Sequence, residues 1–506
     1  MLQQLKRLGG ETIIYGTSTI IGRFLNFLLI PLYTNVLLPG PYGIIAVVYS
    51  LIAFVNVVYS YGMESAYFKY SSTLELGTPK ENFTTPFAAL LASSIFFSLL
   101  IAAFASPLAA AMSLPPGFKS IVYYAAGILA FDALAIIPFA TLRMERKAVQ
   151  FASLKFVNIV VNVGMNVALL VGLHMGVEGI FISGLTASVL TFLLLIPTIV
   201  RHLSPGFHPG LLKALLKFGL PSIPAGLSAT AVQVIDRPIL RALTDDATVG
   251  IYQANYRLGI FMMLIVSMYD YAWRPFFFSM AKDPRAKEIF ARALTYLVLL
   301  MSVIFLGVSL FVGDIVKLSI FGRHIISPNY WDGLSIVPVV LLGYLFFGIY
   351  INVSAGIYIE KKTYYLPAIM FFGALVNVLA NYLLIPSYGM MGAAWATFFA
   401  YLAMAVAGYF VARRVYPVPY EGGRLLKIGG AVAAVMLLYP ALPVSPGTPV
   451  LLWKAGILVL FLGLMFVMKF FDARELSVLR QLTAAARTRK EVGAEQEPPV
   501  EESGAS

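Results

Sequence analysis

A few charged residues lie inside long apolar stretches of this 506-residue sequence, and their types indicate what chemistry they could do. An arginine at the centre of a membrane-spanning helix costs about 2.5–3.5 kcal/mol on insertion scales, so it is expected to serve a function. Arg23 and Arg257 lie far from the ends of such stretches, and Lys155 lies closer to an end. Because guanidinium groups bind diphosphate oxygens through paired hydrogen bonds, we predict that both arginines line an anion-binding lumen. The alternative is an ion pair within the protein, with Glu64 as a partner for Arg23. Lys155 either contacts the entering anion or extends its ammonium group to the water interface.

Acidic residues in the same stretches could couple a cation or a proton to movement of the anion. Asp132 lies in the middle of one stretch, Glu64 and Asp270 lie near the ends of others, and Asp236 directly precedes Arg237. We predict coupling or gating roles for these five residues. For Asp132 and Glu64 the alternative is a salt bridge within the protein. For Asp236 and Arg237 it is a latch between helix ends at an outer gate.

Two pairs of asparagines, Asn162 with Asn166 and Asn377 with Asn381, are spaced four residues apart. This spacing places both members of a pair on one face of a helix. We expect them to bridge neighbouring helices, and a sugar-facing role is the alternative.

Residues for covalent or metal chemistry are scarce. The chain has no cysteine, so it has no disulfide and no thiolate for a metal or a nucleophile. The longest expected outer loop, around 313–332, offers only Asp314, His324 and Asp332 as acid or base groups. We therefore expect no metal, no cofactor and no enzyme activity, against the alternative of a membrane ligase, polymerase or glycosyltransferase.

The elements that must position these residues are membrane-spanning helices. Apolar residues make up 59% of the chain and charged residues 12%, with a mean hydropathy of +0.84, whereas a soluble domain has about 25% charged residues. Runs of roughly 20 apolar residues recur along the chain, each long enough to cross a hydrocarbon core of about 30 Å. The fourteen predicted spans are 12–37, 42–62, 85–112, 120–142, 150–172, 177–200, 215–243, 248–272, 293–313, 333–358, 364–386, 390–412, 425–442 and 449–471.

The basic residues alternate between the two sides of this arrangement. Cytoplasmic loops carry an excess of Lys and Arg. If the N-terminus is placed inside, few basic residues remain in the outer loops: Lys119, Arg237, Arg241, Lys317 and Arg323. We therefore predict a multi-pass membrane protein with both termini cytoplasmic. The net charge of +12 then follows from topology, and no nucleic-acid partner is expected.

The sequence also contains an internal duplication. Residues 145–166 recur at 360–381, an offset of 215, with a Glu-basic-basic triplet at the start and the two asparagines at the end. A second correspondence between the repeats, at an offset of 207, relates Pro31 to Pro238 and Gly43 to Gly250. In membrane chains, internal repeats are typical of transporters, with the substrate site between the copies.

These patterns predict an all-α polytopic membrane protein: a V-shaped, two-lobe transporter with two six-helix repeats followed by two more helices. The predicted parts are an N-terminal lobe at 1–208, a C-terminal lobe at 209–420, two additional helices at 421–471, and a cytoplasmic tail at 472–506 that is amphipathic and then disordered. Each repeat has an even number of spans, so the axis that relates the repeats runs along the membrane normal. Two such bundles could rock about a central cleft.

Several segments resemble the polysaccharide or O-antigen flippase family, within the multidrug/oligosaccharidyl-lipid/polysaccharide exporter superfamily. The resemblance extends over spans 1 to 12 and rests on the order of its motifs. They are Arg23-Phe24, Pro31-Leu32-Tyr33-Thr34, Tyr42-Gly43, Gly62-Met63-Glu64-Ser65-Ala66-Tyr67-Phe68-Lys69, Asp236-Arg237-Pro238, Trp273-Arg274-Pro275-Phe276 and Gly392-Ala393-Ala394-Trp395-Ala396-Thr397. Lys69 stands where the family pattern often has arginine, which keeps the charge but loses the bidentate fork.

The resemblance implies a flippase that moves an undecaprenyl-diphosphate-linked oligosaccharide from the cytoplasmic to the outer leaflet of the bacterial inner membrane. Its partners would be that lipid-linked oligosaccharide, membrane lipids, and polysaccharide polymerase or assembly proteins. A peptidoglycan lipid-precursor flippase and a multidrug or cation antiporter on the same fold remain alternatives.

Overall fold

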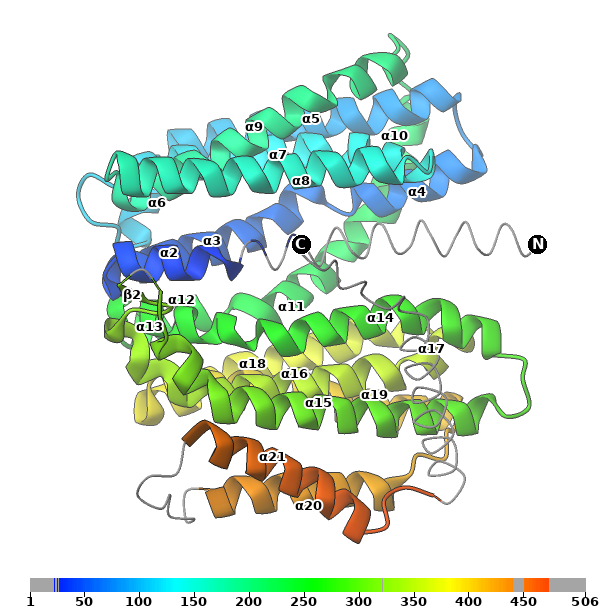
Figure 1. Ribbon diagram of the computed structural model, residues 1–506. Helices are drawn as coiled ribbons and strands as arrows, with labels where there is room; N and C mark the ends of the chain where they lie inside the picture. The colour runs from blue at the N-terminus through cyan, green and yellow to red at the C-terminus, as the bar shows by residue number, and fades with distance from the viewer. Residues whose placement is uncertain (1–21, 23–24, 26, 321, 440–449, 473–506) are drawn as a thin grey trace, which may run out of the picture. The chain divides into compact units, whose positions relative to one another are not determined.

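The computed structural model of the protein describes residues 22, 25, 27–320, 322–439 and 450–472 (Figure 1). The chain divides after Tyr420 into two compact units, residues 1–420 and 421–506. In the described residues, twelve helical stretches are long and apolar enough to cross a membrane. They match the second to twelfth and the fourteenth predicted spans. Half of the first predicted span lies outside the described residues, and the thirteenth corresponds to a helix of 17 residues, α20.

The first half of the larger unit consists of helices with one π-helical turn. They are α2 (Leu29–Val36), α3 (Pro39–Ser60), α4 (Met63–Thr73), α5 (Pro79–Ala103), α6 (Ala105–Ala111), α7 (Ser120–Met144), α8 (Ala148–Val167), the π turn η1 (Ala168–Gly172) and α9 (Gly176–His202).

The second half adds short 3₁₀ segments and one small hairpin. Its elements are α10 (Pro209–Gly219), η2 (Leu220–Ser222), α11 (Ile223–Val234), α12 (Asp236–Leu243), α13 (Asp246–Tyr256), η3 (Arg257–Gly259), α14 (Ile260–Met280), α15 (Ala286–Lys317), β1 (Ser319–Ile320), β2 (Arg323–His324), η4 (Pro328–Ile336), α16 (Val337–Val353), α17 (Ala355–Ile359), α18 (Tyr365–Tyr388) and α19 (Met390–Val415). The hairpin is antiparallel and pairs Ser319 with His324. The smaller unit contains α20 (Gly422–Leu438) and α21 (Val450–Val467).

The sequence duplication is also a duplication of local structure. Arg146 and Lys361, which are 215 positions apart, both adopt positive φ angles, 57° and 56°. In α8 the Asn166 side-chain amide donates to the carbonyl and side-chain oxygens of Asn162, and in α18 Asn381 bonds Asn377 in the same way. The asparagine pairs therefore bond mainly within their own helix. The Tyr33 hydroxyl adds one bridge between helices, because it donates to Asn166 Oδ1 at 3.0 Å.

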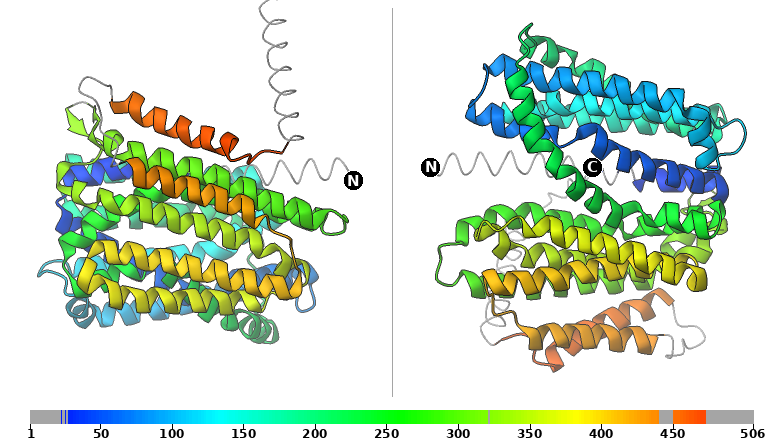
Figure 2. Two further views of the ribbon diagram at one scale, coloured as in Figure 1. Left: turned by 90° about the horizontal axis from the view of Figure 1, so that it is seen from below. Right: turned by 180° about the vertical axis from the view of Figure 1, so that it is seen from behind.

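Helices of each half pack mainly against one another: α5, α7, α8 and α9 in the first half, and α14, α15, α16, α18 and α19 in the second. Helix α10 is an exception. Pro209 begins it, and the His208 ring accepts a hydrogen bond from the Leu211 amide. Leu211 and Leu215 are buried in one cluster with Phe83 of α5 and other side chains of the first half. The sequence assigns α10 to the C-terminal lobe, but the helix packs on α4 and α5, and α11 then leads to the second half (Figure 2).

The two halves contact each other closely where α3 and α13 begin, at the end that carries the β1–β2 hairpin, here called the hairpin end. Pro39 begins α3, and the Asp245 side chain caps α13 by accepting from the Thr248 amide. A Cβ on Gly43 would clash with the Asp246 carbonyl, and a Cβ on Gly250 would clash with the Pro39 carbonyl. Gly43 and Gly250, which correspond at the offset of 207 residues, therefore allow a backbone-to-backbone contact between the repeats.

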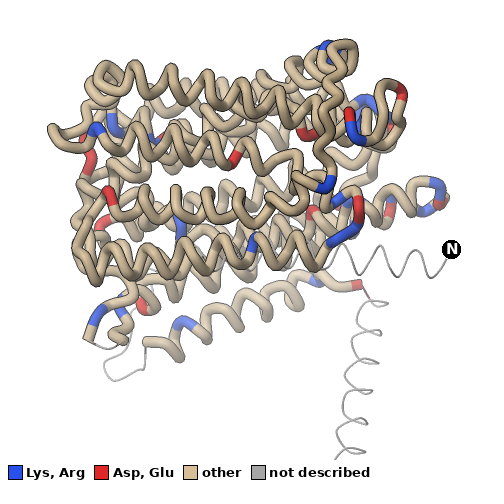
Figure 3. The backbone as a smooth tube through the Cα atoms, turned by 90° about the horizontal axis from the view of Figure 1, so that it is seen from above, with Lys and Arg blue, Asp and Glu red and all other residues tan. Residues whose placement is uncertain are grey.

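Most charged residues of the described chain lie near helix ends, and few interrupt the middles of helices (Figure 3). This distribution fits a chain that spans a membrane, where charge inside the hydrocarbon is costly. The few charges in the middles of helices therefore mark the candidate site.

Candidate functional site

The first half contains a polar cavity of about 520 Å³, here called the N-terminal cavity, between α3, α4, α7, α8 and α9. A cavity of this size is within the range of small-molecule sites, roughly 300–1,000 Å³. Its polar lining residues are Tyr49, Asn56, Glu64, Asp132, Arg143, Lys155, Asn158, Asn162, Ser188 and Thr191. Three of the predicted site residues, Glu64, Asp132 and Lys155, therefore face one cavity.

Asp132 and Lys155 carry opposite charges on two helices that line this cavity. Asp132 on α7 accepts a hydrogen bond of 2.7 Å from the Ser188 hydroxyl of α9. Lys155 on α8 places its ammonium nitrogen 4.2 Å from the centre of the Phe139 ring. Among the described residues, Lys155 makes no ion pair, and both charged side chains are accessible from the cavity. The ammonium group is therefore available to an anion that enters.

Glu64 pairs with a residue other than the one considered from the sequence. Its carboxylate forms an ion pair with Arg143 of α7, and both side chains are about two-fifths exposed at the cavity. Arg23, the partner considered from the sequence, lies outside the described residues. The Glu64–Arg143 pair joins α4 to α7.

Sequence reasoning missed several neutral polar groups of the cavity. The Asn158 amide donates to Thr191 Oγ1 at 2.7 Å and to the Ala187 carbonyl at 3.0 Å, which ties α8 to α9. A signal existed, because Lys155, Asn158 and Asn162 follow the three- and four-residue spacing of one helix face. By contrast, nothing in the sequence indicates that Ser188 and Thr191 would face them.

Arg257 lines a second, smaller cavity of about 290 Å³, here called the central cavity. The cavity is formed by Phe27 and Ile30 from the first half and by Arg257, Gln253 and neighbours from the second. Arg257 interacts electrostatically with Tyr49, which lines the N-terminal cavity and also interacts with Asp132. The predicted arginine of the lumen therefore lies in a cavity between the two halves, near the N-terminal cavity.

Asp236 and Arg237 form a hydrogen-bonded network inside the second half, and Arg237 also lines the central cavity. Arg237 Nη1 lies 2.6 Å from Asp236 Oδ1, and its Nε donates to Gln253 Oε1 at 3.0 Å. Its guanidinium lies 4.1 Å from the centre of the Tyr256 ring. Tyr252 and Thr397 also bond the Asp236 carboxylate, the latter at 3.4 Å. Both residues are almost fully buried, so the network holds α12, α13 and α19 together and leaves no free oxygen of Asp236 facing the N-terminal cavity.

Asp270 lies on α14 beside its own helical neighbour. Its carboxylate accepts from Arg274 Nε at 2.9 Å, one turn along the helix. Arg274 in turn lies over the Tyr358 ring at 5.7 Å. Asp270 lines neither the N-terminal cavity nor the central cavity.

Together, the two cavities place cations, two accessible carboxylates and a set of amide and hydroxyl groups inside the membrane-spanning part of the chain. Amides, hydroxyls and carboxylates form the hydrogen bonds that a polar ligand such as a sugar requires, and Lys155 and Arg257 attract anionic groups. The arrangement can desolvate a polar, negatively charged molecule at moderate cost. An unpaired charge would otherwise pay a very large penalty in hydrocarbon.

A family model described as "Polysaccharide biosynthesis protein" matches residues 34–324. Solved structures share the fold. A lipid II flippase MurJ in an inward closed conformation is 16% identical with a TM-score of 0.72, covering 92% of this chain and 99% of its own. An inward-facing multidrug resistance MATE transporter is 16% identical with a TM-score of 0.62, covering 80% and 97%. An outward-facing MATE transporter has a TM-score of 0.57 at 15% identity, covering 81% and 96%. A search of the curated proteins found no match.

Proposed function

The chain belongs to the polysaccharide biosynthesis protein family and has the fold of transporters of the MOP superfamily, and from that premise we propose a specific activity. It is a flippase that moves an undecaprenyl-diphosphate-linked oligosaccharide from the cytoplasmic to the outer leaflet of the bacterial inner membrane by alternating access. Both termini would be cytoplasmic. The observation that carries the proposal is the pair of polar cavities with Lys155 and Arg257 inside a membrane-spanning bundle.

The head group of such a lipid fits these cavities. A diphosphate needs cationic donors, which Arg257 and Lys155 supply, and in this account Arg23 would add a third. The sugar unit needs neutral hydrogen-bonding groups, which Asn158, Asn162 and their neighbours supply. A central cavity between two halves is also where a transporter built from repeats places its substrate.

The lipid tail needs an apolar path beside the polar cavities. Such a path is the groove of about 710 Å³ between α2 and the helices α14 and α15, here called the α2 groove. Phe27 lines both the α2 groove and the central cavity. Its ring lies 5.3 Å from that of Phe261, edge to face. In the proposal these two rings separate the diphosphate at Arg257 from the isoprenoid chain in the groove.

Asp132 is the candidate for coupling. Of the predicted acidic residues, Glu64, Asp236 and Asp270 each have an arginine partner in the described structure. Asp132 has a hydroxyl partner, Ser188, and faces Lys155 across the cavity. We assign a proton or sodium ion to Asp132 and a gating or structural role to Asp236 and Arg237.

A second candidate function is supported by the fold. The structure with a TM-score of 0.72 is named a lipid II flippase, so a peptidoglycan precursor is the alternative substrate. A multidrug or cation antiporter is a further alternative, because MATE transporters share the fold. Polysaccharide polymerase and assembly proteins are expected as partners only of the oligosaccharide flippase, and not of either alternative.

The test is the leaflet distribution of lipid-linked sugar in cells that lack the protein. We expect the diphosphate-linked unit to accumulate on the cytoplasmic leaflet and wild-type protein to restore its transfer. Arg257→Ala and Lys155→Ala should fail to restore it at equal expression, whereas the control Arg413→Ala, an exposed residue in the last turn of α19, should restore it. An unchanged glycolipid distribution together with lost drug or cation efflux would refute the flippase.

A further inference from the structure

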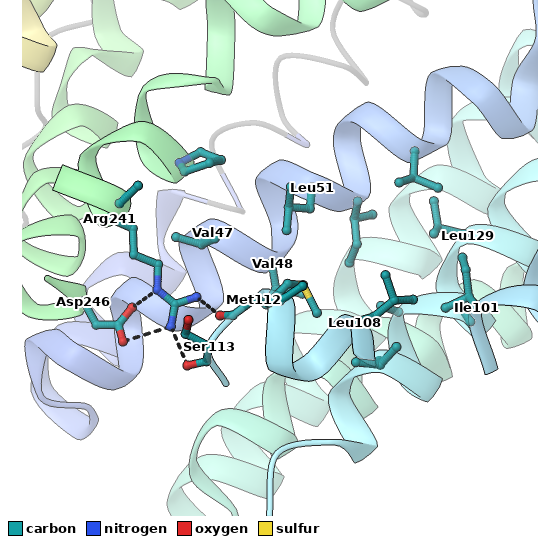
Figure 4. A pocket seen from close by; sticks show the side chains of 18 of the residues that line it. Val47, Val48, Leu51, Ile101, Leu108, Met112, Ser113, Leu129, Arg241 and Asp246 are labelled. Carbon is teal, nitrogen blue, oxygen red and sulfur yellow. Dashed lines mark hydrogen bonds and ion pairs between the residues drawn. The ribbon is translucent and has the colours of Figure 1, made fainter. Parts of the chain in front are cut away.

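The α2 groove has a counterpart in which the two repeats exchange their roles. An apolar groove of about 860 Å³, here called the α12 groove, lies between α12 of the second half and α3, α5, α6 and α7 of the first (Figure 4). Six of its lining residues correspond to lining residues of the α2 groove at one constant offset of 207. The pairs are Pro238 with Pro31, Ala242 with Asn35, Leu51 with Leu258, Ile101 with Val308, Leu108 with Ile315, and Ser113 with Ile320.

The constant offset is the one at which the sequence repeats Pro31 and Gly43. The two grooves are therefore two copies of one feature, formed where the first membrane helix of each repeat meets the other repeat. Both are lined mainly by aliphatic side chains of membrane-spanning helices. An open apolar groove in a bilayer is filled by hydrocarbon, because an empty one forfeits dispersion contacts and an apolar cavity does not hold water.

The two copies differ in what they connect to. The α2 groove shares Phe27 with the central cavity, whereas the α12 groove shares no lining residue with the central or the N-terminal cavity. A lipid whose diphosphate lies at Arg257 can therefore place its tail in the α2 groove but not in the α12 groove. The occupant of the α12 groove is a different lipid.

The polar end of the α12 groove does not select a head group. Arg241 lies there, but its guanidinium forms an ion pair with Asp246 at 2.7 Å and donates to the carbonyls of Met112 and Ser113 (Figure 4). Asp246 balances its charge, and four of its five N–H donors have acceptors. Among the described residues that line the groove, no unpaired cation remains to bind a lipid phosphate. Affinity must come from the apolar walls alone.

We propose that the α12 groove is a second lipid site, which holds an acyl chain of an ordinary bilayer phospholipid without regard to its head group. The site lies between the two halves, so its lipid contacts both repeats. The inference goes beyond the flippase activity, and only the step that excludes the transported lipid from this groove rests on the proposed function.

Native mass spectrometry of the full-length protein, extracted from membranes of defined phospholipid, tests the proposal. Wild type should retain a phospholipid that Ile101→Trp, which fills the α12 groove, loses. The same loss should occur when Ile101→Trp is added to Val308→Trp, which already fills the α2 groove at the corresponding position. Leu99→Trp should retain the phospholipid, since Leu99 is 65% exposed on the same helix as Ile101 and lines neither groove.

Retention of the full phospholipid complement by Ile101→Trp would overturn the proposal, as would equal loss in Leu99→Trp. Retention should also be the same from phosphatidylethanolamine and phosphatidylglycerol membranes, and a preference for one would refute the absence of head-group selection. The leaflet assay separates the two proposals. If the protein is a flippase, Val308→Trp should block glycolipid transfer. If Arg257→Ala does not affect transfer, the flippase proposal is refuted, but the mass-spectrometric result on the α12 groove still holds.

Discussion

At the scale of single residues, the account depends on which charged side chains are paired. Glu64, Asp236 and Asp270 have arginine partners, but Lys155 faces the N-terminal cavity without an ion pair among the described residues. An ammonium inside a membrane-spanning bundle is costly. Asp132 across the cavity balances its charge without forming an ion pair, which leaves the ammonium group accessible to an anionic ligand. In the proposal, Lys155 therefore provides a head-group contact in the first half of the chain, in addition to the contact with Arg257 in the central cavity.

The sequence supplies a substitution for testing Lys155. Met370 occupies the corresponding position of the second repeat, 215 residues later, so Lys155→Met keeps the length of the side chain and removes its charge. A hydrogen bond to a charged group is worth about 1.5–3 kcal/mol, which predicts a loss of tenfold or more in affinity for the diphosphate-linked lipid. Lys155→Arg should retain most of it. Binding to purified protein measures the effect, and equal affinity of the Met variant and wild type would contradict the role.

Asp132 should determine the ion dependence of transport. Asp132→Asn keeps the shape of the side chain and its contact with Ser188 but removes the charge that binds a cation or proton. We expect the variant's transport rate to become independent of the imposed sodium or proton gradient. The control is Asp270→Asn on α14, which should keep the wild-type gradient dependence. Gradient-dependent transport by Asp132→Asn would place the coupling elsewhere.

At the scale of elements, hydrogen bonds between the two halves stabilise the hairpin end, and similar bonds form in both repeats. The hairpin of the second half bonds α2, since Asn35 donates to the His324 carbonyl at 2.8 Å. The segment after α6 of the first half bonds α12, since Arg241 donates to the Ser113 carbonyl at 3.1 Å. Between these ties, Gly43 and Gly250 bring α3 and α13 into backbone contact. The end therefore opens only if all three contacts separate.

Alanine at either glycine should favour the state in which the hairpin end is open. A Cβ at Gly43 or Gly250 clashes with a backbone carbonyl of the other helix, whereas Gly40 has open space around it and provides the control. Because the chain lacks cysteine, a single cysteine at buried Ala46, one turn along α3 from Gly43, reports opening. We expect faster maleimide labelling in Gly43→Ala and Gly250→Ala than in Gly40→Ala. Equal labelling of all three would show that the contact does not control opening.

The loop between α7 and α8 should make stability depend on pH. Glu145 lies 2.8 Å from Lys147 Nζ and 3.0 Å from His202 Nε2. Burial raises the pKa of the Glu145 carboxyl, but hydrogen bonds from Lys147 and His202 outweigh it and bring the pKa below its ordinary 4.5. A carboxyl whose pKa is lower in the folded state than in the unfolded state stabilises the fold at pH values above its unfolded-state pKa. This stabilisation is lost as the pH falls through the folded-state pKa.

Glu145→Gln should therefore destabilise the protein near pH 6 by about 0.2–1 kcal/mol, the range of exposed ion pairs. The difference from wild type should shrink as the pH falls below about 4.5. Thermal unfolding in detergent between pH 6 and pH 4 measures it. A difference that stays constant over this range would mean that the carboxylate charge contributes nothing.

Most of the helices could be predicted from the sequence because each contains an apolar run long enough to span the membrane. The repeat could be predicted because Gly43, Asn162 and their echoes keep their spacing. Contacts between helices leave no such mark: the pairing of Glu64 with Arg143, the packing of α10 on the first half, and the meeting of Lys155 with Asp132 depend on tertiary structure. The predicted boundary between lobes and the roles of the eight site residues stay predictions.

At the scale of the whole molecule, the proposed function joins these features into one route for an amphipathic lipid. In the proposal, the polar cavities accept a charged, sugar-bearing head group, and the α2 groove accepts a tail that remains in the bilayer. Desolvation explains why both are needed, since the head group cannot enter hydrocarbon and the tail is not stable in a polar lumen. A carrier of small drugs would need no apolar groove that joins its central cavity.

The most direct measurement is transfer of an undecaprenyl-diphosphate-linked oligosaccharide in liposomes that contain only the purified protein. A sugar-modifying enzyme that cannot cross the membrane reports how much of the lipid lies in the outer leaflet. The account predicts that wild-type protein makes the inner pool accessible and that Arg257→Ala does not. If wild-type liposomes and protein-free liposomes expose the same fraction, while the protein moves drugs or cations across the same membrane, the central claim is contradicted.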